Sequence, residues 1–73
     1  MVKRDFDDAV TACFSKIHSR LAEATRIAKA AEACAQAGSV GEAVTISMDI
    51  EQLIYEAGRL HEAASLMNRL SQD

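Results

Sequence analysis

The chain has 73 residues with a formal net charge of −3, no proline, three glycines and two cysteines. This length allows one small domain whose own core is marginal, and a net negative charge gives no support to general nucleic-acid binding. No run approaches the ~18 apolar residues of a membrane span, and the N-terminus lacks the apolar stretch of a signal peptide. The cysteine spacing does not match a disulfide framework or a zinc motif. We therefore expect an all-α protein of the reducing cytoplasm.

The first half of the chain has the periodicity of a long helix. An acid at Asp5, Asp7 or Asp8 is expected to start it. From Val10 onward, apolar residues follow at alternating steps of four and three, which predicts a helix packed lengthwise on another helix. This predicted seam contains Val10, Phe14, Ile17, Leu21, Ala24, Ala28, Ala31 and Ala35. A second column contains Phe6, Cys13, Arg20, Ile27 and Cys34, so the apolar stripe is wider than one helical contact requires.

The middle of the chain reads as a helix end followed at once by a helix start. Gly38 is expected to take the left-handed conformation that ends many helices. Ser39 and Glu42 form the Ser-x-x-Glu pattern of a capping box, in which the Glu42 carboxylate would accept from the Ser39 N–H. We therefore predict an antiparallel helical hairpin with its turn at about residues 37–40, forming a single domain over residues 1–73.

The second half repeats the same periodicity. Its predicted seam contains Ala43, Ile46, Ile50, Leu53, Ala57, Leu60, Ala64 and Met67. In both arms the bulky residues come early in the sequence and the small residues come late. Folding at Gly38 therefore sets large side chains against small ones, as close packing requires. Each arm should be ~45 Å long, with a register defined to about one helical turn.

One alternative breaks the second arm in two. The pattern Ala-Gly-x-x-x-Glu-Ala at the turn recurs from Ala57 to Ala63, and the stretch from Tyr55 to Ala63 resembles the inter-helix turn of a tetratricopeptide repeat. A third helix would then begin after Gly58. No capping residue follows Gly58, and the seam continues through it, so we favour a continuous second helix.

A two-helix hairpin leaves many apolar side chains without cover. Two hairpins could cover them by pairing into a four-helix bundle, and a different helical protein could cover them instead. The candidate interface residues are Phe6, Cys13, Ile27, Cys34, Ile54, Ala63 and Leu70.

No phosphate-binding loop, nucleophile elbow or catalytic triad is recognisable, so neither enzyme activity nor a cofactor is expected. The expected function is a small protein-interaction or assembly module, a homodimer that binds another protein. As an alternative, basic residues of the first arm would contact RNA or DNA in a small regulator. These residues are Lys16, Arg20, Arg26 and Lys29. A third hypothesis, redox or metal sensing through Cys13, Cys34, His18 and His61, lacks an evident third ligand.

Overall fold

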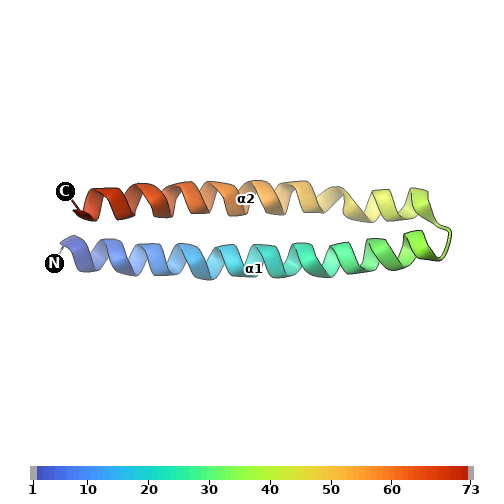
Figure 1. The fold of residues 1–73 in the computed structure, drawn as a ribbon, viewed down its shortest axis with the longest axis horizontal. Helices are drawn as coiled ribbons and strands as arrows, with labels where there is room; N and C mark the ends of the chain where they lie inside the picture. The colour runs from blue at the N-terminus through green and yellow to red at the C-terminus, as the bar shows by residue number, and fades with distance from the viewer. Residues whose placement is uncertain (1, 73) are drawn as a thin grey trace.

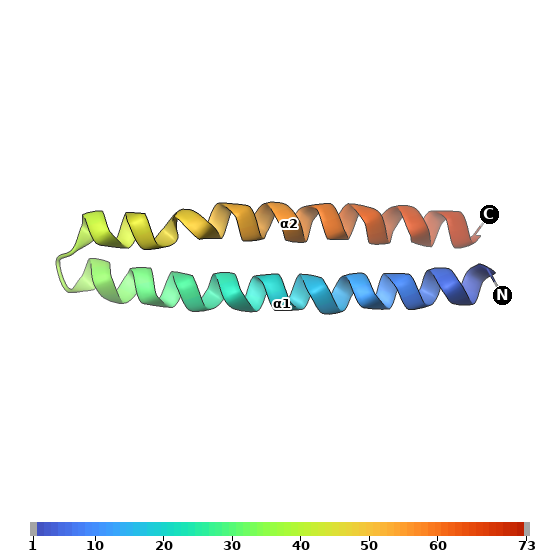
Figure 2. The ribbon, with the colours of Figure 1, turned by 180° about the vertical axis from the view of Figure 1, so that it is seen from behind.

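The computed structural model describes residues 2–72, and in this range the chain forms two long α-helices joined by a short turn (Figure 1). Helix α1 spans Val2–Gln36 and helix α2 spans Val40–Gln72. The helices lie antiparallel and side by side in both views (Figure 2), and the hairpin measures 56 × 14 × 11 Å. The predicted antiparallel hairpin is confirmed. Met1 and Asp73, the two ends of the predicted domain, lie outside the described residues.

Helix α1 begins earlier than predicted. The chain is already helical at Val2, so Asp5 lies in the first turn and the expected start at an acid between residues 5 and 8 is wrong. No glycine or proline interrupts this end, and Lys3 Nζ lies 3.6 Å from Asp7 Oδ2 across one helical turn. An acid in the first turn also suits the helix dipole. The additional residues make α1 longer than predicted.

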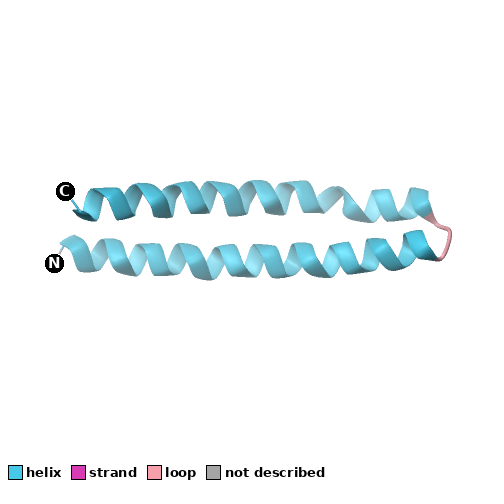
Figure 3. Ribbon diagram, viewed as in Figure 1, coloured by secondary structure: helices cyan, strands magenta, loops and turns pink. Residues whose placement is uncertain are grey.

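The short loop between α1 and α2 (Figure 3) ends α1 with a Schellman motif. Gly38 has a φ of +94°, a conformation that a side chain would strain. Its N–H donates to the carbonyl oxygen of Ala35 at 3.0 Å, and the Ser39 N–H donates to that of Cys34 at 3.0 Å. These two bonds satisfy carbonyls that the end of a helix would otherwise leave free. The predicted left-handed glycine is confirmed.

The predicted capping box is not formed as expected. The Ser39 N–H is already engaged by Cys34, so it does not bind the Glu42 carboxylate. Glu42 Oε2 instead accepts from the Cys34 thiol, with 4.0 Å between sulfur and oxygen. The Schellman motif and the capping box compete for one backbone donor, and the Schellman motif takes it.

The seam of α1 differs from the prediction in one of its two columns. The covered or half-covered positions are Phe6, Ala9, Val10, Cys13, Ile17, Arg20, Ala22, Ala24, Ile27, Ala31 and Cys34. The predicted members Phe14, Leu21, Ala28 and Ala35 are exposed. A helix contacts one neighbour through a strip about two columns wide, so an apolar stripe of three columns leaves one uncovered. The covered column contains Arg20, which forms an ion pair with Glu56 on α2.

The seam of α2 follows the prediction except near the turn. Ala43, Ile50, Leu53, Ala57, Leu60, Ala64 and Met67 are all buried or half-buried. Ile46 is 37% exposed, and the neighbouring Ser47 is half-buried in its place. Phe14 and Ala64 line the same shallow depression, but Phe14 is 52% exposed.

The hairpin has a thin core. Among the described residues, the buried apolar side chains are four alanines, Ala24, Ala43, Ala57 and Ala64. The chain exposes 5433 Å², whereas a compact monomer of this mass would expose about 4,400 Å². Alanines bury little area each, so the apolar contact between the two helices is small for their length.

Helix α2 runs through Gly58 without a break, so the continuous second helix is confirmed and the three-helix alternative is wrong. A Cβ atom added at Gly58 would meet nothing within 4 Å. Gly58 therefore does not mark a close contact between the helices. It is an exposed glycine inside a helix, where alanine would be more favourable.

We predict that Gly58→Ala and Gly38→Ala change stability in opposite directions. Gly58→Ala should stabilise the fold by up to about 1 kcal/mol because alanine has the higher helix propensity. Gly38→Ala should destabilise it by about 1–2 kcal/mol because an L-residue is strained at positive φ. Urea unfolding followed by circular dichroism would measure both. A stabilising Gly38→Ala would contradict the Schellman turn.

Candidate functional site

One edge of the hairpin carries a ladder of paired positions. Residues that lie equally far from Gly38 in the sequence face each other there, as two contacts show. Arg20 Nε donates to Glu56 Oε1 at 2.8 Å, and Cys34 lies against Glu42 at the same relative spacing. Three further pairs of positions lie level with each other. They are found by moving seven residues at a time along α1 and seven residues in the opposite direction along α2. These pairs are Phe6 and Leu70, Cys13 and Ala63, and Ile27 and Asp49.

We name this the charged edge, because most exposed side chains along it are ionised. On α1 it includes Lys16 and Glu23, and on α2 it includes Glu42, Asp49 and Glu56. Its centre is the Arg20–Glu56 ion pair, whose two side chains are each 39% exposed. Gln52 Nε2 also donates to Glu56 Oε2 at 3.1 Å. The hydrogen bond from Gln52 and that from Arg20 hold the pKa of Glu56 below its ordinary value of 4.5.

The opposite edge is apolar. Around the axis of α1, Leu21 lies on one side of Ile17 and Arg20 lies on the other. Around the axis of α2, Ile54 lies on one side of Ala57 and Glu56 lies on the other. Because Arg20 and Glu56 pair on the charged edge, Leu21 and Ile54 share the other edge. We name it the apolar edge and define it as Phe14, Leu21, Ala28 and Ala35 of α1 with Ile54 of α2.

The apolar edge exposes large side chains. Phe14 is 52% exposed, Leu21 is 42% exposed and Ile54 is 51% exposed. Within α1 the column from Phe14 to Ala35 contains no charged residue. The matching column of α2 is Val40, Ser47, Ile54 and His61, which includes the polar His61 but no Asp, Glu, Lys or Arg. An uncharged strip that joins both helices is the kind of surface that another protein surface covers.

The predicted interface residues do not form one surface. Phe6, Cys13, Ile27 and Cys34 are half-buried on the face of α1 that α2 covers. Ala63 and Leu70 are exposed on the charged edge, near the open end of the hairpin. Ile54 alone of the seven lies on the apolar edge. Phe14 and Leu21, which the sequence assigned to the seam, are the larger exposed anchors there.

Two of the four candidate nucleic-acid contacts are held by carboxylates. Arg20 pairs with Glu56, and Arg26 Nη2 lies 3.0 Å from Glu23 Oε1. Lys16 and Lys29 are exposed. The guanidinium groups that would contact phosphates are therefore partly neutralised within the chain.

The cysteines and histidines are not assembled into a site. Cys13 and Cys34 are free thiols, and the polar partner of Cys34 is the Glu42 carboxylate rather than a lysine. His18 and His61 are both exposed. Among the described residues, no group of three His, Cys, Asp or Glu side chains is placed to hold a metal ion.

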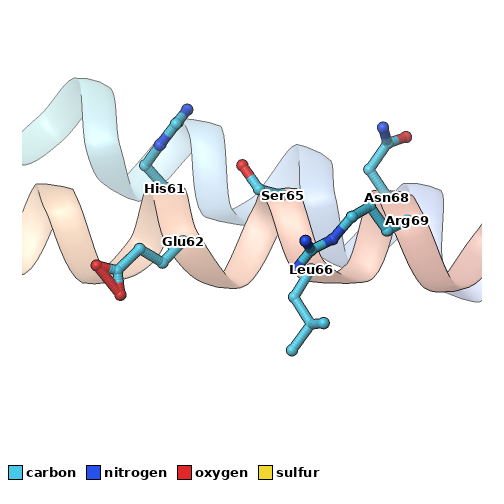
Figure 4. A pocket seen from close by; sticks show the side chains of 6 residues that line it. All are labelled: His61, Glu62, Ser65, Leu66, Asn68 and Arg69. Carbon is cyan, nitrogen blue, oxygen red and sulfur yellow. The ribbon is translucent and has the colours of Figure 1, made fainter.

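The surface depressions are shallow and open. One of them is lined by six side chains of α2 alone (Figure 4). In this view His61 and Asn68 point to one side of the helix, whereas Glu62 and Leu66 point to the other. A depression formed by divergent side chains of a single helix does not enclose a ligand, since small-molecule sites are concave and bury most of the ligand surface.

Comparison with known protein families, curated proteins and solved structures found no match for this chain. Neither helix contains, among the described residues, a segment long and apolar enough to cross a membrane.

We predict that Glu56→Gln lowers stability at pH 7 through loss of the ion pair with Arg20. Because the folded state lowers the pKa of Glu56, its stabilising contribution is present above the ordinary value of 4.5 and is lost as the pH falls through the lowered pKa. The difference in urea midpoint between the native chain and the variant should therefore shrink below pH 4.5.

Glu51→Gln is the matched control, because Glu51 is an exposed glutamate of the same helix. It should leave the urea midpoint nearly unchanged at both pH values. A midpoint difference for Glu56→Gln that stays constant from pH 7 to pH 3 would contradict the assigned role of the ion pair.

Proposed function

We propose that this protein is a non-enzymatic interaction and assembly module that forms a homodimer through its apolar edge and binds another protein through surface left free. The observation that carries the proposal is the uncharged strip shared by both helices, with Phe14, Leu21 and Ile54 all about half exposed. Two strips that face each other would remove these side chains from water. The product is a four-helix bundle, in which every helix has two neighbours.

The exposed area supports self-association. The chain exposes 5433 Å², which exceeds the expectation for a compact monomer by about 1,000 Å². A stable protein–protein interface buries roughly 800 Å² on each partner. The excess is therefore of the size that one interface would cover, and the hairpin has a length of 56 Å over which to distribute it.

The helical pattern also suits a bundle. A helix with one neighbour needs two apolar columns, whereas a helix in a bundle needs a third beside them. In α1 the third column is Phe14, Leu21, Ala28 and Ala35, and α2 does not cover it. The polar residues Thr11, His18, Thr25 and Glu32 follow next around the helix. This order of columns is expected of a helix with two buried sides and one solvated side.

The outer face of α2 remains free in such a dimer. Met48 and Tyr55 are exposed there, and they line one shallow depression together with Glu51 and Gln52. Aromatic residues and methionine are enriched in the centres of protein interfaces. We assign the contact with a different protein to this face.

The nucleic-acid alternative has weaker support from the geometry. Arg20 and Arg26 are each paired with a glutamate, and the chain carries a net charge of −3. A phosphate ligand would have to displace both glutamates, so the protein-interaction proposal is the better supported of the two.

We predict that Leu21→Lys converts the dimer into a monomer. The substitution places a charge on each copy at the centre of the interface, and it should weaken association by more than about tenfold. Leu66→Lys is the matched control, because Leu66 is 47% exposed and lies on the outer part of α2.

Sedimentation equilibrium at micromolar concentrations would measure association of both variants. The native chain and Leu66→Lys should be dimeric, and Leu21→Lys should be monomeric. A native chain that sediments as a monomer, or two variants that weaken association equally, would rule out the apolar edge as the dimer interface.

A further inference from the structure

We infer that the two hairpins of the dimer pair with their turns at opposite ends, about a two-fold axis that crosses α1 between Ala24 and Thr25. This inference rests on the proposed self-association through the apolar edge, and it names the orientation of the second copy. It follows from the order of large and small side chains along the edge, combined with the hairpin register that the Arg20–Glu56 contact fixes.

Two symmetric arrangements can bring the apolar edges together. If the two-fold axis runs parallel to the helices, both turns lie at the same end and α1 packs on α2 of the partner. If the axis runs across the helices, the turns lie at opposite ends and α1 packs antiparallel on α1 of the partner. The two arrangements place different side chains opposite each other.

The arrangement with both turns at one end packs poorly. A two-fold axis parallel to the helices permits no shift of one copy along the other. Residues that are equally far from Gly38 therefore lie at the same height on the two sides of the interface. Leu21 is then nearly level with the partner's Ile54, and Ala28 is nearly level with the partner's Ser47. Large side chains meet large ones and small meet small, which leaves overlap at one point and a gap at the next.

The arrangement with turns at opposite ends packs well. The column Phe14, Leu21, Ala28 and Ala35 runs from large to small along α1. When it is laid antiparallel on its own copy, a single axis position sets Phe14 opposite the partner's Ala35 and Leu21 opposite the partner's Ala28. One axis position serves both pairs, because the midpoint of each pair along α1 falls between Ala24 and Thr25. Large then meets small along the contact, as interdigitated packing requires.

Helix α2 supports the same axis position. With the register fixed by Arg20 and Glu56, this axis places Ser47 within about half a helical turn of the partner's Ile54. Ile54 is one of the most exposed apolar residues of the edge, and a small side chain opposite it leaves room for it. The same complementarity therefore arises on both helices from one choice of axis.

Distances between spin labels on the two copies would distinguish the arrangements. Labels are attached to Asp8→Cys and, separately, to Lys29→Cys, in a chain that also carries Cys13→Ala and Cys34→Ala. Both labelled positions are exposed and lie in one column of α1. With turns at opposite ends, the two labels of a dimer are separated along the helix by about 50 Å at position 8 and about 14 Å at position 29.

Each outcome of the labelling experiment decides one point. A much longer distance at position 8 than at position 29 supports the inference. Equal distances at the two positions overturn it and leave self-association standing, because a two-fold axis parallel to the helices keeps all such distances alike. If the spin labels show no interaction with each other at either position, the proposed dimer itself is overturned.

Small-angle X-ray scattering of the native chain provides a second measurement that needs no substitution. A dimer with both turns at one end keeps the 56 Å length of the hairpin. The inferred dimer is offset along its axis and should be longer by about 14 Å. A dimer with a maximum length near that of the single hairpin would overturn the inference, and a monomeric scattering mass would overturn the dimer.

Discussion

The Schellman turn at Gly38 fixes the register on which every other contact of the hairpin depends. Gly38 adopts a φ of +94°, and the bonds from Gly38 and Ser39 to Ala35 and Cys34 close the end of α1. Once α2 starts at Val40, positions equally far from Gly38 face each other along the charged edge. Arg20 therefore meets Glu56, and Cys34 meets Glu42.

Much of this architecture could be predicted from the sequence because it depends on local chemistry. Absence of proline, frequent alanine and apolar residues at helical spacing predict two helices, and Gly38 predicts the turn between them. The seam of α2 is also predictable, because a single pair of apolar columns runs along most of it. The Ser39–Glu42 capping box was not predicted correctly, because the Schellman motif uses the same N–H.

The seam of α1 could not be predicted from hydrophobicity. Apolar columns flank Val10, Ile17 and Ala24 on both sides, and residue type alone does not show which of them α2 covers. In the structure, α2 covers the column that contains Arg20, a polar residue in an otherwise apolar column, whose ion pair with Glu56 joins the two helices. Equal spacing of Arg20 and Glu56 from Gly38 was the available signal for it. The same choice moved Phe14 and Leu21 to the surface and so changed the proposed interface.

The most direct test of the central claim, that the hairpin completes its core by pairing with a second copy, is the concentration dependence of thermal unfolding. Since the folded dimer and the unfolded monomers differ in molecularity, dilution favours unfolding. Circular dichroism of the native chain over a hundredfold range of concentration should show a melting temperature that rises steadily with concentration. A sharp, cooperative transition at the same temperature throughout that range would show that the single hairpin is stable alone and would contradict the account.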